Sequence, residues 1–342
     1  MKVKARGSFA VLLLAGLGMI AGMIYVSLTN GEFDITVKDI VRTLLRINPN
    51  PDYDLVVFEF RLPRIVIAVL VGMGLGIAGA VIQGVTRNGL ADPGMLGINA
   101  GAGVAIVVFL YFYQGQIREI TWFSVMAMPL FGLLGGLMAA LMIYLFAWKN
   151  GRLEPQRLLL TGLAIASGLS AISLFLTLRM NSQDFEMVAV WTTGSIYNAN
   201  WKYIASILPW FAVLIPIIYA RSHTLNLLQL DDDSARSVGV QLEKQKGILL
   251  LSGIGLVSAC VSVAGGIGFI GLIAPHIARR LVGQAHQRSL PICAVVGALL
   301  VLAADFIGKT LFSPVELPAG IIVAILGVPS FVFLLHRRKG RA

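Results

Sequence analysis

The sequence predicts an all-α polytopic membrane protein whose 342 residues form a single transmembrane domain, 1–342. Hydrophobic residues make up 57% of the chain and charged residues only 13%, whereas about a quarter of the residues in a soluble globular domain are charged. The mean hydropathy is +0.83. The net charge of +10 does not indicate nucleic-acid binding, because the basic residues lie between apolar runs and not on one contiguous face. These observations exclude an ordinary soluble enzyme.

Ten apolar windows are long enough to be candidates for crossing about 30 Å of hydrocarbon. The first window follows three basic residues, as in a signal peptide, but about 20 residues can span a membrane and no small-residue cleavage site follows, so we interpret it as the first span. The eighth window is the shortest, because Gly265-Gly266 marks a tight turn before it and Pro275-His276 ends only a short apolar run. The predicted spans are residues 8–28, 62–83, 92–113, 122–147, 157–178, 201–220, 246–264, 267–280, 290–308 and 318–336.

The distribution of charge between the spans predicts the topology. Ten spans place both termini on one side of the membrane. If that side is the cytoplasm, the inner segments hold 18 Lys and Arg with 6 Asp and Glu, and the outer segments hold 9 and 11. Such an excess of inner Lys and Arg follows the positive-inside rule. We therefore predict a cytoplasmic-membrane protein with both termini in the cytoplasm, an external segment at 30–60 and a cytoplasmic loop at about 221–246.

Positive charge at the outer face is the exception to this topology. The external segment, expected to hold a short amphipathic helix and a loop, leads into a span that opens with Arg61, Pro63 and Arg64. Pro63 suits the first turn of a helix, where its missing N–H costs nothing, and snorkelling to the interface is one interpretation of the two arginines. Asp305 and Lys309, at the outer end of the ninth span, have the spacing of an i,i+4 ion pair, and Lys309 adds a third positive group to this face.

Small residues inside the spans predict a closely packed bundle. Glycine at such spacing lets helices approach each other in lipid, where no hydrophobic force drives their association. The two cysteines, Cys260 and Cys293, lie in apolar stretches and are expected to pack as small side chains without forming a disulfide. The glycines within the second and fourth spans are Gly72, Gly74, Gly76, Gly79, Gly132, Gly135 and Gly136.

Patterns typical of enzymes are scarce. The four histidines fall at cytoplasmic ends of spans, and none forms H-E-x-x-H. Asp231-Asp232-Asp233 would suit a magnesium–diphosphate site only with a second aspartate-rich segment, which the chain lacks. A simpler interpretation is that an aspartate is the N-cap of a short helix over 235–238, which ends at Gly239. No Walker loop occurs, so the chain does not itself bind and hydrolyse ATP in that way. We predict no catalytic residue, metal ion or cofactor.

The junction after the second span is unusually polar for a membrane protein. It reads QGVTRNGLADPGMLGINAGAG, from Gln83 to Gly103. Asn88-Gly89 and Asp92-Pro93-Gly94 are turn formers, and the later glycines loosen the start of the third span. A flexible, partly unwound helix end on the cytoplasmic side suits a gate or a translocation path, although a connecting loop could have the same composition.

Six segments, in order over nearly the whole chain, resemble the FecCD family, the membrane permeases of ABC importers for iron-siderophores, haem and cobalamin. The resemblance implies the type II importer permease fold, with ten helices in each subunit and a dimer that encloses the translocation path. Two ATPase subunits would lie below this dimer and a substrate-binding protein above it. The matching segments are RLPR (61–64), GAVIQGVTRNGLADPGMLGINAGAG (79–103), RLLLTGLAI (157–165), DDDSARSVGV (231–240), GGIGFIGLIAPHIAR (265–279) and ELPAGIIVAILGVPSFVFLL (316–335).

On the outer face, the resemblance implies that Arg61, Arg64 and Lys309 receive acidic residues of the binding protein. Lys309 stands where some relatives have arginine, so it keeps the charge but loses the bidentate fork.

On the inner face, the resemblance implies coupling helices at about 225–244 that sit in a cleft of the ATPase. The implied coupling residues are Asp231, Ala235, Arg236 and Gly239, in which the small side chains suit close approach. The implied gate residues are Asn88, after the second span, and Gln156, which stands in a region where relatives have small hydroxyl residues.

The function implied by the resemblance is transport of an iron-siderophore, with cobalamin or haem as the alternative cargo. The implied partners are two copies of an ATPase, a second permease of the same or a homologous kind, the binding protein and membrane lipids, with no nucleic acid. An ion-coupled secondary transporter would need ionisable groups at membrane depth, and an embedded transferase would need paired acidic metal sites. The sequence disfavours both alternatives.

Overall fold

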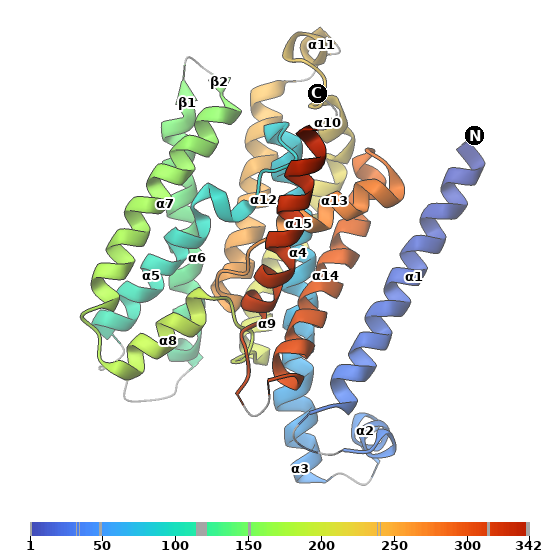
Figure 1. Ribbon diagram of the computed structural model, residues 1–342, viewed down its shortest axis with the longest axis vertical. Coiled ribbons are helices and arrows are strands. Elements are labelled where there is room, and N and C mark those ends of the chain that lie inside the picture. Colours follow the sequence, from blue (N-terminus) through green and yellow to red (C-terminus); the bar gives the residue numbers. More distant parts are fainter. Residues whose placement is uncertain are drawn as a thin grey trace.

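The computed structural model places a helix at each of the ten predicted spans (Figure 1). It describes residues 2–31, 33, 35–47, 50–113, 122–149, 152–237, 239, 241–312 and 315–339. The helices at the predicted spans are α1 (Lys2–Thr29), α4 (Leu62–Thr86), α5 (Ile98–Tyr113), α6 (Trp122–Ala147), α7 (Pro155–Thr177), α9 (Trp201–Ala220), α12 (Leu242–Ala264), α13 (Ile270–Val282), α14 (His286–Thr310) and α15 (Ala319–Lys339).

Fewer helices meet the length and hydropathy of a membrane crossing than the ten predicted spans. Within the described residues, seven helices are long and apolar enough to cross a membrane, and they include α1, α4, α6, α7, α9, α12 and α14. The remaining three, α5, α13 and α15, are shorter or have shorter apolar parts. Because a helix rises about 1.5 Å per residue, the 13 residues of α13 cover only about 20 Å. The fold class is therefore confirmed, and ten crossings stay a prediction.

Short elements gather at the two ends of the bundle (Figure 1). One end carries α2 (Val37–Leu44), α3 (Pro51–Asp54) and α8 (Ser182–Thr192). The opposite end carries both chain termini, the helices α10 (Ser222–Leu227) and α11 (Asp232–Ser237), and the antiparallel strands β1 (Trp148–Lys149) and β2 (Arg152–Leu153). We call these the outer and inner ends, following the predicted topology.

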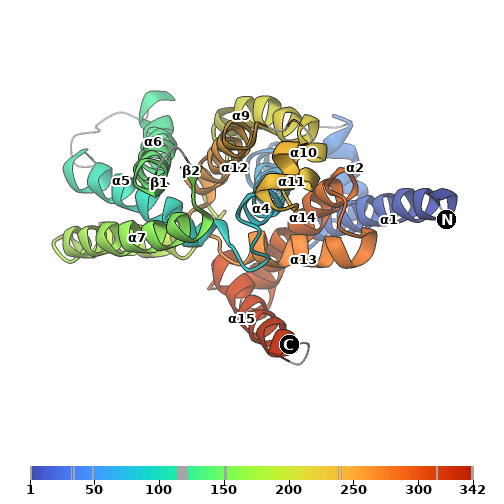
Figure 2. The same ribbon diagram turned by 90° about the horizontal axis from the view of Figure 1, so that it is seen from above.

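Helix α4 lies in the middle of the bundle, among α9, α12, α13 and α14 (Figure 2). In the apolar segment that contains α4, 78% of the most apolar window is buried, against 6% in α1 and 11% in α7. Cys260 and Cys293 are both buried and free, as predicted. The core therefore surrounds α4, whereas α1 and α7 expose most of their surface.

Glycine allows α4 and α14 to touch backbone to backbone, as the sequence predicted for closely packed spans. A Cβ atom added to Gly72 would overlap the carbonyl oxygen of Gly297, and one added to Gly297 would overlap the carbonyl of Gly72. Such contacts replace the hydrophobic driving force that is absent between helices in lipid. Gly76 is equally close to the Cys293 carbonyl, so backbone contacts at these two points hold α4 and α14 together.

We expect Gly72→Ala to lower the free energy of unfolding by about 1–3 kcal/mol, because the added methyl group forces the two helices apart. Gly18→Ala on α1 is the matched control, since its Cβ would meet no atom within 4 Å and alanine favours a helix by up to about 1 kcal/mol. Thermal unfolding of the purified subunit in one detergent compares the two variants. Equal stability of Gly72→Ala and Gly18→Ala would contradict the packing argument.

The start of the second span differs from the prediction. Pro63 lies in the first turn of α4, as predicted, but α4 does not begin the helical segment, because η1 (Leu55–Arg61), a π-helical segment that follows α3, precedes α4 without a break. A proline inside a helix has no N–H for the carbonyl four residues earlier and its ring crowds that group. The preceding turns are wider here, and Leu62 N–H bonds to the Val57 carbonyl, five residues back. The helix thus extends beyond the predicted entry.

The eighth predicted span, 267–280, is matched by α13, which begins at Ile270 and continues through Pro275 to Val282. The turn at Gly265 is confirmed, since its φ is +67° and its N–H bonds to the Val261 carbonyl. Helix α8 was not predicted, because residues 178–200 are too polar for a span; Asn181 caps α8 by accepting a hydrogen bond from Asp184 N–H at 2.9 Å.

Candidate functional site

The three predicted docking residues converge at the outer end, although Lys309 lies more than 240 positions from the arginines. Arg61, Arg64 and Lys309 all line one cavity of about 660 Å³. The same cavity is lined by Asp305 and Glu316, and by residues of the external segment and of the connection between α8 and α9. The structure therefore brings the predicted residues together, along with acidic partners that sequence reasoning did not assign to the site.

Arg64 is held by two carboxylates of the same chain. Its Nε lies 2.9 and 3.0 Å from the two oxygens of Asp305, and its guanidinium forms ion pairs of 2.8 Å with both Asp305 and Glu316. The Asp305 side chain is 7% exposed and that of Arg64 15%, so the pair is largely withdrawn from water. The guanidinium also lies 5.7 Å from the ring centre of Tyr197. This arrangement ties α4 to α14 and to the start of α15.

Arg61 and Lys309 instead hold the end of α1. Arg61 is buried and donates hydrogen bonds to the carbonyls of Leu28 and Phe33, the second at 2.6 Å. Lys309 donates to the Ser27 carbonyl at 3.1 Å and lies 3.4 Å from the Asn30 carbonyl. Cations satisfy helix C-terminal carbonyls well, because those groups carry partial negative charge. Both residues therefore fix the passage from α1 to α2.

These contacts revise the predicted character of the outer face. The ion pair that the sequence permits between Asp305 and Lys309 is replaced by the pair between Asp305 and Arg64. Among the residues that line the cavity, three basic side chains stand beside four acidic ones, which are Asp52, Glu59, Asp305 and Glu316. The predicted positive surface is thus largely neutralised within the subunit. Docking of a binding protein on the three basic residues stays a prediction.

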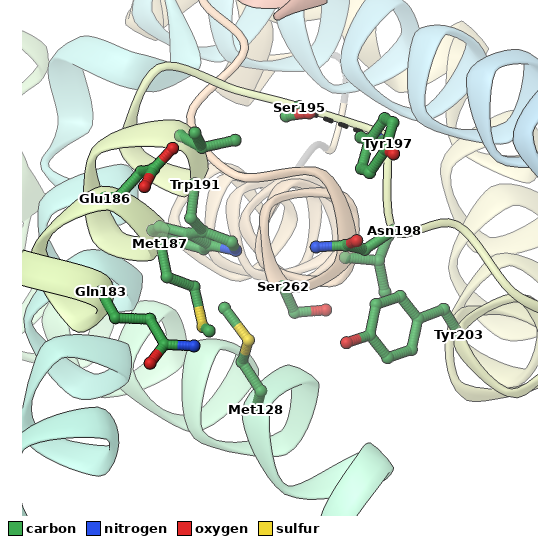
Figure 3. Close-up of a pocket in the computed structure, with 12 residues that line it drawn as sticks. Met128, Gln183, Glu186, Met187, Trp191, Ser195, Tyr197, Asn198, Tyr203 and Ser262 are labelled. Atoms are coloured by element: carbon green, nitrogen blue, oxygen red, sulfur yellow. Dashed lines mark hydrogen bonds between the residues drawn. The ribbon is translucent and has the colours of Figure 1, made fainter. Parts of the chain in front are cut away.

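A second cavity of about 290 Å³ opens beside the first and was not predicted (Figure 3). Figure 3 shows the thioethers of Met128 and Met187 near Tyr203 and Ser262, below Trp191. Its walls come from α6, α8, α9, α12 and the connection after α8, and Tyr197 and Asn198 line both cavities. The two cavities at the outer end therefore adjoin each other, and helix α8, which was not predicted, supplies several residues of the second cavity.

The predicted coupling segment forms two short helices at the inner end. The N-cap assignment is confirmed: Asp231 accepts a hydrogen bond from Ser234 N–H at 2.9 Å, which lowers the pKa of Asp231 below its ordinary value. Gly239 has φ +83°, as expected for a residue that ends a helix, and bonds to the Arg236 carbonyl. The helix spans Asp232–Ser237 and not 235–238, because the cap lies one residue before Asp232; Val238 lies outside the described residues.

The burial of the coupling residues corrects one part of their interpretation. Ala235 is fully buried in the subunit, so its small side chain permits packing of α11 onto this chain and does not present a surface to a partner. Asp231, Arg236 and Gly239 are exposed. The part of the predicted coupling site that a partner could reach therefore consists of these three residues and their exposed neighbours.

The predicted gate residues lie on different elements. The loop that follows α4 is built from turns, as predicted: Asn88 accepts a hydrogen bond from Leu90 N–H and Asp92 from Gly94 N–H, each at 3.0 Å. Gln156 is exposed in the first turn of α7. Within the described residues no polar contact joins Asn88 to Gln156 directly. The loop does reach α7 further along, where a Cβ on Gly97 would touch the Gly162 carbonyl.

Sequence reasoning missed the residues that connect the inner segments. Arg87 ends α4 in the left-handed conformation with φ 52°, and it binds the Leu228 carbonyl and the Asp232 carboxylate, each at 2.6 Å. Gln229 donates to the Gly84 carbonyl at 2.8 Å. The partners are about 140 positions apart, and no motif in the sequence links them. The inner end of α4 is therefore bound directly to the predicted coupling segment.

Comparison with known proteins identifies the class to which this fold belongs. The model of the FecCD transport family matches residues 19–337, and the chain belongs to that family. A solved metal-chelate type ABC transporter in an inward-facing conformation superposes with a TM-score of 0.82 at 29% sequence identity, covering 96% of this chain and 99% of that one.

Two curated relatives come from Bacillus subtilis (strain 168). The iron-uptake system permease protein FeuC is 54% identical over 92% of this chain and 94% of its own length. The iron(3+)-hydroxamate import system permease protein FhuG is 41% identical over 98% of this chain and 99% of its own length. The resemblance described from six short segments therefore extends over nearly the whole chain.

Proposed function

We propose that this chain is the permease subunit of an ABC importer that carries an iron-siderophore complex across the cytoplasmic membrane. The observation that carries this proposal is the 54% identity to FeuC, a permease of an iron-uptake system, over 92% of the chain. The similarity to FhuG, a permease for iron(3+)-hydroxamate, supports the same cargo class. Cobalamin and haem are the alternative cargoes.

We propose that the subunit works as a dimer with a second permease, two ATPase subunits and a substrate-binding protein. Family membership supports the kinds of partner, and the exposed surface of α7, of which only 11% of the apolar window is buried, offers a face for another subunit. The charge distribution supports a cytoplasmic location for the end that carries α11 and both termini (Figure 1). In this orientation α11 faces the ATPase and the cavity with Arg64 faces the binding protein.

We propose a passive coupling mechanism for transport. A loaded binding protein docks at the outer end, with Arg61, Arg64 and Lys309 at the centre of the contact, where charge complementarity favours encounter and register. ATP binding then closes the ATPases, and α10 and α11 transmit this closure to the spans. The exposed residues Asp231 and Arg236 provide charged groups for contact with the ATPase. Movement at Asn88 and Gln156 would open the inner end.

The distribution of buried ionisable groups does not favour an ion-coupled transporter. Buried ionisable side chains among the described residues include those of Arg61, Lys246, His286 and Asp305. These four residues lie at or near the ends of their helices. Ion-coupled transporters place such groups near the middle of the membrane. An ABC importer needs none there, because ATP hydrolysis in a separate subunit supplies the energy.

Radiolabelled uptake tests both the class of transporter and its cargo. A strain that lacks its own copy of this permease, complemented with this chain, is offered iron-hydroxamate, iron-catecholate, iron-citrate, haem and cobalamin in turn. We expect uptake of one or more ferric siderophores, and its loss when ATP is depleted while ion gradients are kept intact. Uptake of cobalamin or haem alone would overturn the cargo assignment, and uptake that survives ATP depletion would overturn the ABC mechanism.

A further inference from the structure

A single carboxylate at the inner end contacts two separate parts of the bundle. Asp232, the first residue of α11, accepts a hydrogen bond from Arg87 Nη2 at 2.6 Å through one oxygen. Its other oxygen lies 3.5 Å from Lys246 Nζ. Arg87 ends α4, and Lys246 lies in the second turn of α12. The short helix α11 is therefore connected through one side chain to two of the most buried helices.

The first connection reaches one predicted gate segment. Arg87 immediately precedes Asn88, and its left-handed backbone turns the chain out of α4. Its guanidinium also donates to the Leu228 carbonyl at 2.6 Å, so it grips the chain on both sides of the link between α10 and α11. The guanidinium is planar and holds its donors in fixed directions, so its two contacts, with Leu228 and Asp232, are fixed relative to each other. Movement of α11 must therefore pull on the loop that begins at Asn88.

The second connection reaches the other gate segment. Lys246 Nζ lies 3.7 Å from a carboxylate oxygen of Glu243, and the other oxygen of Glu243 accepts a hydrogen bond from Leu153 N–H at 3.0 Å. Leu153 ends β2, and α7 begins at Pro155 with Gln156 next. The Asp232 carboxylate is thus linked through two side chains to the strand that leads into α7.

We propose that Asp232 is the positioning residue through which α11 moves both gate segments, the loop at Asn88 and the start of α7 at Gln156. This inference rests on the proposed function, because it assumes that α11 receives the movement of an ATPase. The contacts supply the physical connection: one oxygen of Asp232 accepts a hydrogen bond from Arg87, which leads to Asn88, and the other lies near Lys246, which leads through Glu243 to α7.

The electrostatics keep this connection intact at neutral pH. Burial raises the pKa of Asp232, but the hydrogen bond from Arg87 and the charges of Lys246 and Arg87 outweigh burial, so the pKa lies below its ordinary value and the group is ionised. The Lys246 side chain is only 5% exposed. A buried ammonium is stabilised by nearby carboxylates, and Asp232 at 3.5 Å is a second one beside Glu243 at 3.7 Å, so Lys246 favours the connected arrangement over one in which only Glu243 remains.

The test uses the complete importer in proteoliposomes, with its ATPase, permease partner and binding protein, and measures siderophore transported per ATP hydrolysed. We expect Asp232→Asn to lower this ratio about tenfold, within the range of free energies that couple distant sites, while ATP hydrolysis and assembly persist. Asp232→Glu keeps the charge and should recover at least half of the ratio. Asp233→Asn, at an exposed neighbour on α11 without a described side-chain contact, removes the same charge but keeps the contacts with Arg87 and Lys246, so it should lower the ratio less than Asp232→Asn does.

Substitutions at Arg87 give an independent second measurement. Arg87→Gln removes only the branch toward Asn88, so we expect a smaller loss than for Asp232→Asn, with partial recovery in Arg87→Lys. The double variant should be little worse than Asp232→Asn alone, because both substitutions break the contact between Arg87 and Asp232, and the double variant loses in addition only the Arg87 hydrogen bond to the Leu228 carbonyl. If Asp232→Asn fails to assemble, the two variants Arg87→Gln and Arg87→Lys test the inference in its place, because both leave the contacts of Lys246 intact.

Three results would overturn the inference. The first is an unchanged transport ratio in both Asp232→Asn and Arg87→Gln. The second is a proportional fall of uptake and ATP hydrolysis, which would mean that the residues only support ATPase docking. The third is equal loss in Asp232→Glu and Asp232→Asn. By contrast, a wild-type importer without ATP-driven siderophore uptake would show that the proposed function itself is wrong.

Discussion

Arg64→Met is expected to lower the free energy of unfolding by about 3 kcal/mol and to abolish uptake. The substitution leaves the largely buried carboxylate of Asp305 without its partner, and it also releases Glu316. Breaking a buried ion pair on one side is costly because an uncompensated charge stays in a poorly solvated place. Thermal unfolding of the detergent-solubilised importer and radiolabelled uptake in cells measure the two effects. Full stability of Arg64→Met would contradict the buried-pair interpretation.

A neutral triple variant separates stability from docking. Combining Arg64→Met with Asp305→Asn and Glu316→Gln removes all three charges, so no carboxylate is left unpaired, and replacing a whole buried ion pair is often neutral or stabilising. We expect the triple variant to unfold near the wild-type temperature but to bind the loaded binding protein more weakly than the wild type does. If uptake recovers with stability, Arg64 serves only the fold, and the docking role would be wrong.

Arg61→Met is expected to release the link between α1 and the external segment, lowering stability by about 2 kcal/mol and reducing uptake strongly. Arg61 donates charge-assisted hydrogen bonds to the carbonyls of Leu28 and Phe33, and each such bond contributes more than a neutral one. A methionine would fill part of the space but would donate no hydrogen bond to either carbonyl. Limited proteolysis within residues 28–36, together with uptake, measures the effect.

Arg46→Gln is the matched control for both arginines. Arg46 lies on the same outer end and pairs with Asp54 at 2.8 Å, but its side chain is 62% exposed. Exposed ion pairs contribute about 0–1 kcal/mol. We expect little change in stability or uptake for this variant. An effect as large as that of Arg61→Met would mean that net charge on the outer end matters more than the buried contacts.

The buried contacts also affect how charge reversal at the docking face should be interpreted. Exchanging Arg61 and Arg64 for glutamate would place a carboxylate against the Leu28 and Phe33 carbonyls and another against Asp305 and Glu316. Like charges at such distances repel strongly. Loss of uptake in that double variant would therefore combine misfolding with failed docking, which the neutral triple variant avoids.

The helical architecture could be predicted from the sequence because its cause is local. Each span is an apolar window set by the thickness of the membrane, so the ten helices follow from hydropathy alone. Elements that do not cross the membrane leave no such signal. Helix α8 was missed for that reason. The π-helical turns before Pro63 were missed because the sequence predicted that a helix begins near Pro63, whereas the helical segment already continues there from η1.

The candidate sites were only partly predictable, for a different physical reason. Motif resemblance predicted which basic residues would lie together, and Arg61, Arg64 and Lys309 do line one cavity. It did not predict what they bind, because Arg64 and Asp305 are 241 positions apart and a charged side chain does not specify its partner. The connection between Asp232 and Arg87 is hidden in the same way. Such pairs need coordinates.

The backbone contact of Gly72 with Gly297 has a consequence for measuring motion. No side chain lies between α4 and α14 at this point, so rotamer changes cannot alter their spacing, and separation would break the tightest packing between the two helices. We therefore expect α4 and α14 to move together during a transport cycle, while other helices are displaced relative to this pair. Superposing different states on α4 and α14 gives a fixed frame of reference in which the movements of α7, α11 and α15 can be read directly.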